Sequence, residues 1–267
     1  MKRLFDIYYS YMKIVIAMQL QYRASLLIWA FSSLVWVLIP LVVWVTVAKS
    51  QGGQVGSYSS GDFAAYFIAL LIVEQTTFTW VIWEMGERIR SGQLSPKLLR
   101  PIHPIHEDVA WNISYKAITF ALILPSALLI GWAFHAEFHP HVWHIVVFFP
   151  SLISAFLMRF VMEWTIGLVG FWVTRTSAIN QIYSTLFLFL SGQMTPLSLL
   201  PRPLEMLANI LPFKWAVAFP TELVLGRLTP TQVLLGFAIQ ASWLLVSLIA
   251  FRFIWRLGIS RYSAVGA

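Results

Sequence analysis

Long apolar stretches separated by short polar connections dominate this chain. A helix needs about 20 apolar residues to cross the roughly 30 Å hydrocarbon core of a bilayer. Five stretches meet this requirement: 24–48, 63–86, 109–134, 143–173 and 230–253. A sixth, 178–195, would cover about 27 Å as a helix and just reach across. The pattern therefore predicts an all-α, polytopic membrane protein with six transmembrane helices.

The first residues have the pattern of a helix that lies along a membrane surface. Within 3–20, polar or small residues recur every three or four positions, including Asp6, Ser10 and Lys13, while aliphatic and aromatic residues occupy the other face. Such a helix buries its apolar face in the interface and keeps its polar face in water. We predict an interfacial helix here; the alternative is that these residues begin the first span.

Between Leu190 and Leu228 the apolar pattern is interrupted by prolines, which remove a backbone donor and break helices. Broken backbone exposed to lipid would leave polar groups without partners, so it must be buried in protein or lie near water. The stretch stays apolar but offers no uninterrupted span. It therefore predicts a re-entrant hairpin over 196–228, directly before the last span. Its prolines are five of the chain's 13: Pro196, Pro201, Pro203, Pro212 and Pro220.

The basic residues orient the spans. With the N-terminus inside, twelve Lys and Arg fall in cytoplasmic segments, four on the opposite side, and Lys116 and Arg159 within spans. The positive-inside rule then places both termini in the cytoplasm. Only an even number of spans keeps the C-terminal arginines on that side. The Gly- and Ser-rich loop 51–61 becomes an external flexible connection.

Composition agrees and excludes several classes of function. The hydrophobic fraction is 59% and the charged fraction 11%, against about 25% charged in soluble domains, so 1–267 is read as a single membrane domain. The absence of cysteine excludes disulfides and thiolate metal sites. The net charge of +7 is scattered singly at span ends, which argues against nucleic acid as a partner. No phosphate-binding GxxxxGK[ST] loop occurs, so nothing recognisable here hydrolyses a nucleotide.

Three ionisable residues lie near the middle of spans, where each costs roughly 2.5–3.5 kcal/mol on insertion scales. Arg159 and Glu163 are four residues apart and can pair on one helical face. This pair either lines a transport path or subunit contact, or only neutralises itself. Glu74 has no local cation, which favours a path or a partner on another helix.

Two groups of histidines are candidate metal ligands. One group lies at the fourth span's entry, interrupted by Pro140, so it does not hold one helical face. We predict an interfacial loop of amphipathic rings there, no metal site, and the same for the pair in the internal loop. The first group is His135, His139, His141 and His144 with Glu137 among them, and the pair is His103 and His106.

The internal loop 88–108 contains a short helix signal. Ser95 is predicted as an N-cap, Pro96 occupies the favoured first turn, and Pro101 ends the helix. Leu98 and Leu99 would then be displayed between Lys97 and Arg100, which suits docking to another protein. The alternative is an ordinary loop.

Two segments carry a resemblance to a known family. RSGQLSPKLLRP (90–101) is similar to a coupling segment, and SGQMTPLSLLPRPLEMLANILPFKWAVAFPTELVLGRL (191–228) is similar to an external hairpin with a G-x-x-x-P turn, a proline pair, LPF and a closing P-x-x-x-x-x-G. Both resemble permease subunits of ATP-binding-cassette transporters of the type-2 exporter superfamily, in a bacterial six-span branch. One departure is Thr195, where an aromatic residue often precedes the proline.

The resemblance implies a function and partners. It implies an elbow helix at 3–20, a coupling helix at 95–101, and a gate at 196–228. It also implies a second permease, identical or homologous, and separate ATPase subunits that carry ATP and Mg²⁺, in the bacterial inner membrane. The chain itself would be no enzyme and would hold no cofactor. The aromatic and aliphatic spans suggest an amphipathic or lipid-like substrate for export. The implied coupling residues are Ser95, Pro96, Lys97, Leu98, Leu99 and Arg100, and the implied gate residues are Gly192, Pro196, Pro201, Pro203, Pro212, Pro220 and Gly226.

Two other classes of function stay open at this point. A proton-coupled secondary transporter would use Glu74 or the Arg159–Glu163 pair, and it predicts inverted repeats, which the sequence does not display. A membrane-embedded enzyme or assembly subunit would need polar residues that converge near one face, and these are sparse.

Overall fold

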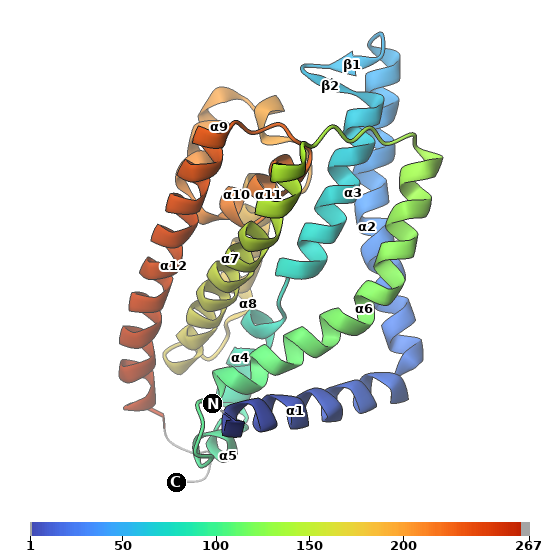
Figure 1. Cartoon of the computed structure of the whole chain (residues 1–267). Helices are drawn as coiled ribbons and strands as arrows, with labels where there is room; N and C mark the ends of the chain where they lie inside the picture. The colour runs from blue at the N-terminus through green and yellow to red at the C-terminus, as the bar shows by residue number, and fades with distance from the viewer. Residues whose placement is uncertain (1, 263–267) are drawn as a thin grey trace.

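The computed structural model describes residues 2–262, and of residues 2–5 only the backbone. The chain is a bundle of long helices with a helix across one end and short helices at the other (Figure 1). The α-helices are α1 (Lys2–Gln21), α2 (Arg23–Ser50), α3 (Ser60–Thr77), α4 (Val81–Arg90), α5 (Ser95–Leu98), α6 (Ile105–Ala133), α7 (Val142–Gly167), α8 (Ser177–Leu190), α9 (Arg202–Ile210), α10 (Pro212–Ala216), α11 (Ala218–Val224) and α12 (Pro230–Ile259). Two 3₁₀ turns, η1 (Leu168–Phe171) and η2 (Leu197–Leu199), and two strands, β1 (Gln54–Val55) and β2 (Tyr58–Ser59), complete the fold.

The prediction of an all-α polytopic membrane protein is confirmed. Within residues 2–262, five helical segments are long and apolar enough to cross a membrane: Arg23–Ser50, Ser60–Arg90, Ile105–Ala133, Val142–Phe171 and Pro230–Ile259. They correspond to the five long stretches of the sequence. The sixth, α8, has 14 residues, which cover about 21 Å.

Several predicted boundaries were wrong, each for a local reason. The span 63–86 is not continuous, because the helix is interrupted between Thr77 and Val81. The span 143–173 leaves the α conformation at Gly167 and tightens into η1. The span 178–195 ends at Leu190, since the chain turns at Gly192, which has φ +95°. Toward the end that carries α5, α6 extends about one turn and α12 nearly two turns further than predicted.

The helix predicted over 3–20 is present as α1, separate from α2, and lies across one end of the bundle against α6 (Figure 1); its place in a membrane interface stays a prediction. Val15 is buried, and Ile7, Tyr8 and Tyr11 are half-buried, so part of the apolar face packs on protein. Ile14 remains exposed, as a helix in the membrane interface would have it.

The most buried helix is α3, which is enclosed by α2, α6, α7 and α11. Every side chain from Phe63 to Leu71 is buried. A helix that is apolar on all sides is typical of the centre of a membrane domain. A smaller apolar cluster near α5 is built around Met85, Leu94, Trp164 and Leu168.

The two ends of the bundle differ in charge. One end, which we call the basic end, carries α1, α5, the α7–α8 connection and the last turn of α12 (Figure 1). The opposite end carries β1, β2 and α9.

The loop 51–61, which was predicted to be flexible, contains the β1–β2 ribbon, in which Val55 is paired with Tyr58. Arg227 holds this ribbon by binding the Ser57 carbonyl oxygen at 3.1 Å and Asp62 at 2.8 Å.

Candidate functional site

The interruption between α3 and α4 lies at the centre of the bundle, where water cannot satisfy free backbone groups. The carbonyl oxygen of Phe78 accepts a hydrogen bond from Lys116 Nζ of α6 at 3.0 Å. The hydroxyl of Thr79 donates to Glu163 of α7 at 2.5 Å, and Arg159 donates to the Thr77 hydroxyl at 3.1 Å. Charged side chains of two neighbouring helices therefore hold the broken segment, as the membrane interior requires.

Arg159 is the centre of this cluster and is only 4% exposed. Its Nε lies 2.8 Å from Glu163 Oε1, and its Nη1 lies 3.0 Å from Glu74 Oε1. The Tyr183 hydroxyl of α8 donates to the same Glu163 oxygen at 2.9 Å. The guanidinium also lies 4.0 Å from the ring centre of Phe187.

The expected Arg159–Glu163 pair is therefore present, and the partner of Glu74 is the same arginine, on another helix. We call these three residues the ion cluster. It faces the protein interior and joins α3 to α7, while Tyr183 adds α8. The sequence predicted the Arg159–Glu163 pair and left the partner of Glu74 open; the structure brings all three residues together beside the helix break.

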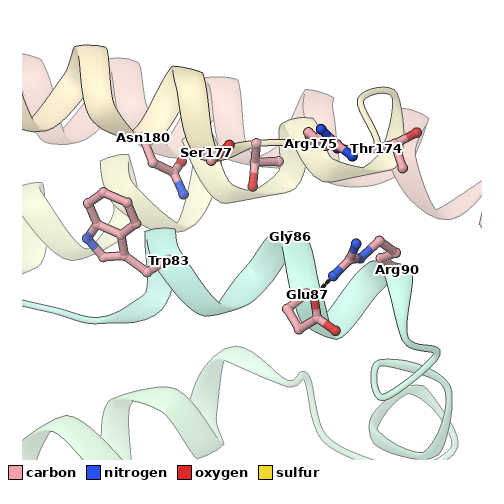
Figure 2. Close-up of a pocket in the computed structure, with 9 residues that line it drawn as sticks. Trp83, Gly86, Glu87, Arg90, Thr174, Arg175, Ser177 and Asn180 are labelled. Carbon is pink, nitrogen blue, oxygen red and sulfur yellow. Dashed lines mark hydrogen bonds and ion pairs between the residues drawn. The ribbon is translucent and has the colours of Figure 1, made fainter.

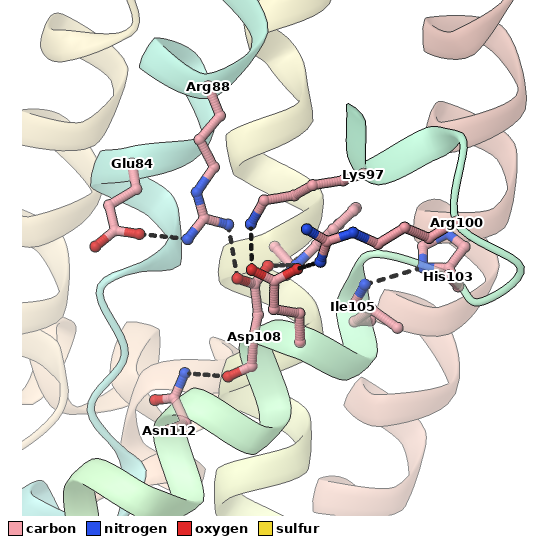
Figure 3. Close-up of polar contacts among 10 residues, drawn as sticks. Glu84, Arg88, Lys97, Arg100, His103, Ile105, Asp108 and Asn112 are labelled. Carbon is pink, nitrogen blue, oxygen red and sulfur yellow. Dashed lines mark hydrogen bonds and ion pairs between the residues drawn. The ribbon is translucent and has the colours of Figure 1, made fainter. Parts of the chain in front are cut away.

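The loop 91–104, which contains α5, is anchored by ion pairs to the start of α6 (Figure 3). Lys97 Nζ lies 3.1 Å from Glu107 Oε1, and Arg100 Nη1 lies 2.8 Å from Glu107 Oε2. Arg100 also donates to the Tyr11 hydroxyl of α1 at 3.0 Å. That hydrogen bond, together with the charge of Glu107, raises the pKa of Arg100.

A second set of ion pairs fixes α4 to α6 beside this loop (Figure 3). Arg88 lies between Glu84 of its own helix and Asp108, at 2.6 Å from the latter. The indole of Trp164 donates to the other Asp108 oxygen at 2.9 Å. Because Asp108 is 3% exposed, this link of α4 and α7 to α6 is shielded from solvent.

Three details of the predicted coupling helix were wrong. The helix α5 ends at Leu98, not at residue 101. Ser95 does not cap it; Leu94 precedes the helix, and the Ser95 hydroxyl lies 2.9 Å from that of Tyr262. Leu98 packs against the buried cluster around Trp164 and is not displayed.

Leu99, in contrast, is 88% exposed, the highest exposure among the large apolar residues that the structure describes. Pro96 and Arg100 are exposed beside it. The loop therefore offers one leucine on a rigid base and not the predicted leucine pair.

His103 and His106 have structural contacts. The His103 ring lies 4.4 Å from the ring centre of Trp255 and also meets Trp164 and Phe251. Burial lowers the pKa of His103, so this ring is neutral at pH 7. His106 shares a hydrogen bond of 2.8 Å with the Tyr8 hydroxyl.

The stretch predicted to be a re-entrant hairpin, 196–228, forms η2 and three short helices, α9, α10 and α11. In Figure 1, α10 and α11 descend from α9 into the bundle beside α7 and α12. Pro203 and Pro212 fall in the first turns of α9 and α10, where a missing N–H costs nothing. Pro196, Pro212 and Pro220 are buried, and Pro201 and Pro203 are exposed.

Side chains from the long helices satisfy the hairpin's free carbonyl groups. The Tyr66 hydroxyl of α3 donates to the Gly192 oxygen at 2.9 Å. The indole of Trp44 donates to Met194, that of Trp243 to Ile210, and the amide of Gln240 to Trp215, at 2.9, 3.2 and 2.9 Å. The re-entrant backbone is thus completed by four side chains of α2, α3 and α12.

The glycines of the hairpin allow close contacts. A Cβ on Gly192 would lie 2.6 Å from the Tyr66 hydroxyl, and one on Gly226 would lie 2.7 Å from the His139 carbonyl oxygen. Gly226 has φ +76°, a conformation that other residues rarely adopt. The hairpin's end is therefore locked against the 135–144 loop.

The histidines of that loop are used in packing. His144 accepts a hydrogen bond from the His141 backbone N–H at 3.1 Å and lies 3.1 Å from the Leu228 carbonyl oxygen. Within residues 2–262, no three His or acidic side chains gather in a way that could hold a metal ion.

Comparison with known families now gives these features a context. Residues 34–266 match the model of a family described as ABC-2 family transporter protein. The chain belongs to the ABC-2 transporter family. The matched range includes α3 to α12, and with them the ion cluster, the α5 loop and the proline hairpin. A search of curated proteins finds no match.

The family assignment confirms the resemblance to an ABC-2 type permease. An ABC-2 permease is a transporter component that is not itself catalytic, and the family implies association with an ABC ATPase subunit. The chain is therefore a multi-pass membrane permease.

The contacts of several residues in this ABC-2 chain could not be predicted from its sequence. Lys116 was seen within a span but given no partner, because a backbone carbonyl at a helix break has no sequence signature. Tyr183, Thr79 and Gln240 gave no signal beyond a polar group in an apolar segment. A polar residue in a span is the one signal that could have found them.

Proposed function

We propose that this ABC-2 permease exports an amphipathic or lipid-like substrate and is powered by a separate ATPase subunit, which binds ATP and Mg²⁺. The observation that carries the proposal is the α5 loop, where Leu99 stands exposed on a base fixed by Glu107 and Tyr262. An exposed apolar side chain flanked by a cation is typical of the centre of a protein contact. The coupling role of Ser95 to Arg100 is part of this proposal.

A continuous set of contacts links the α5 loop to the proline hairpin, the proposed gate, and supports a route by which the ATPase could act on the gate. From α5 the chain leads back to α4, which is fixed to α6 through Arg88 and Asp108. From α4 toward the end of the bundle opposite the basic end, the next element is the helix break held by the ion cluster, and α3 follows the break. Tyr66 of α3 binds Gly192 at the start of the hairpin. ATPase closure would tilt α4 at the break and shift the hairpin through α3.

A proton-coupled secondary transporter is less well supported. Such a protein needs a carboxylate that loads and releases a proton during transport. Glu74 and Glu163 are instead both bound to Arg159 at a helix break. A membrane-embedded enzyme would need free polar groups that converge, and the cluster's groups bind one another.

We further propose six spans, with α8 as the fifth, and both termini in the cytoplasm of a bacterium, in its inner membrane. The distribution of basic residues supports this orientation, since the basic end holds both α1 and the end of α12 (Figure 1). The exposed apolar side chains of α2 and α8, such as Phe31 and Ile182, would contact lipid and a second permease, identical or homologous. No nucleic acid is expected as a partner.

Labelling of single introduced cysteines tests this orientation, and the chain has no native cysteine to remove. Cysteines at Ser57 and Ser198 should react with an impermeant maleimide in intact cells, and one at Gln93 only after permeabilisation; all three sites are exposed. Ser95 is a poorer site because it is half-buried against Tyr262, and Ser263 lies outside the described residues. Protection of a cysteine at Ser57, together with labelling of one at Gln93 in intact cells, would show that the topology is the reverse of the proposed one.

Affinity purification tests the function itself. The tagged chain, expressed together with an ABC ATPase of the same genome, should co-purify with its partner ATPase and hydrolyse ATP. The tagged chain alone should hydrolyse none, because it has no phosphate-binding loop. The control is the ATPase alone with detergent micelles. ATP hydrolysis by rigorously pure chain, or the absence of any copurifying ATPase, would contradict the proposal.

A further inference from the structure

A cavity of about 420 Å³ opens at the basic end, between α4 and the connection that leads into α8 (Figure 2). Its walls are polar on the α8 side, where Thr174, Thr176 and Ser177 contribute hydroxyl groups. None of these three hydroxyls forms a hydrogen bond with any residue that the structure describes. The cavity is independent of the ion cluster and of the α5 loop.

The charges around the cavity favour an anion. The first-turn N–H groups of α8 have no side-chain cap, and a helix N-terminus carries partial positive charge. Arg175 lines the cavity and forms no ion pair within the described part of the chain. Arg90 also lines it but is paired with Glu87, which lines it too. One positive charge, that of Arg175, is thus left without a partner.

A buried acceptor adds an independent requirement. Asn180 lines the cavity and is 2% exposed. Its Nδ2 donates to the Ile82 carbonyl oxygen at 2.9 Å, and its Oδ1 has no partner. Buried acceptors are rarely left unpaired, so the missing partner is a donor such as a hydroxyl group. A bare phosphate diester offers no donor, whereas a polyol esterified to phosphate does.

The surroundings of the cavity suit a lipid. Trp83 lines it and is 38% exposed, as amphipathic rings at a membrane interface often are. Further along α8, on its outer face, Ile182, Leu186 and Phe189 are exposed at spacings of four and three residues. They form one apolar stripe on which acyl chains can lie.

We infer that this cavity binds a phosphate ester of a polyol that has free hydroxyl groups. Examples are the headgroup of phosphatidylglycerol and a soluble phosphorylated polyol. The phosphate would lie at the α8 N-terminus and Arg175, and a hydroxyl would donate to Asn180 Oδ1. The apolar stripe favours the lipid as the source. The site requires only the membrane fold and no ATPase, so its test is separate from that of the proposed function.

Binding is measured by native mass spectrometry of the purified chain in neutral detergent. Phosphatidylglycerol should bind about tenfold or more tightly than phosphatidylcholine of the same acyl chains, which lacks both the net charge and the hydroxyls. Arg175→Gln should remove most of this preference. The matched control, Arg256→Gln, changes an exposed arginine at the same end and should leave it intact. Equal binding of the two lipids, or equal loss in both variants, would overturn the inference.

Ser177→Asp separates ligand binding from folding. A carboxylate at the first turn stabilises a helix N-terminus, so the melting temperature should stay or rise while phosphatidylglycerol binding falls about tenfold or more. Glu87→Gln releases Arg90 and should strengthen binding. Unchanged binding in Ser177→Asp would refute the site. If glycerol 3-phosphate binds as tightly as the lipid, the anion site stands but its ligand is the soluble polyol phosphate.

Discussion

Replacing Arg159 with methionine is expected to lower the melting temperature of the purified chain by on the order of 10 °C. The change leaves Glu163, which is 1% exposed, and Glu74 without the cation that both bind. Removing one partner of a buried ion pair costs about 3–5 kcal/mol, and each kcal/mol shifts the midpoint by about 2–4 °C in a chain of this size. Size-exclusion chromatography of the heated, detergent-solubilised protein measures the shift.

Recovery by second-site changes identifies the reason for the loss. The sequence predicted one pair, for which Arg159→Met with Glu163→Gln would restore stability. Because Glu74 binds the same arginine, that double variant should recover only in part. The triple variant, with Glu74→Gln added, should recover most of the midpoint, since no buried charge is then left unpaired.

Arg252→Met is the matched control, because Arg252 is exposed on α12 and its loss should leave the midpoint unchanged. A triple variant that is no more stable than Arg159→Met would mean that the arginine holds the Thr77 hydroxyl and Phe187 more than it holds the carboxylates. A wild-type midpoint in Arg159→Met would remove the ion cluster as a structural element.

The spans could be predicted from the sequence because their signal is local. Twenty or so consecutive apolar residues must cross a bilayer whatever their neighbours are. Four of the five long stretches form one long helix each, and the fifth forms α3 and α4 on either side of a break. The break at Phe78–Trp80 could not be predicted, because residues 63–86 read as one apolar run. The break is stable only because Lys116, Arg159 and Glu163 on two other helices satisfy it.

The proline hairpin marks the same boundary between local and tertiary information. The prolines predicted that the helical backbone is interrupted. In a membrane, other protein groups must then form hydrogen bonds with the freed backbone groups. Which groups do so was not readable: an indole on α2, a phenol on α3 and an amide on α12 are far apart in the sequence. In the α5 loop, likewise, only the packing separates half-buried Leu98 from exposed Leu99.

This difference between the two leucines gives the last test, which concerns coupling to the ATPase. Leu98→Asp would place a carboxylate against the cluster around Trp164 and damage the fold. Leu99→Asp would not, because the side chain is 88% exposed. If Leu99 is the apolar centre of the ATPase contact, desolvating a carboxylate there should cost roughly 2–4 kcal/mol, or on the order of a hundredfold in affinity.

The Leu99→Asp chain should therefore reach the membrane in wild-type amount and melt at the wild-type temperature, yet lose its ATPase on affinity purification. Leu204→Asp is the control, since Leu204 is an exposed leucine of α9 at the opposite end of the bundle and should keep the ATPase bound. In the wild-type chain Lys97 and Arg100 are paired with Glu107, and an unchanged melting temperature of Leu99→Asp would show that the loop keeps its fold. A Leu99→Asp chain that retains its ATPase and transports at the wild-type rate would exclude the α5 loop as the coupling element, because an unpaired carboxylate buried in that contact is costly.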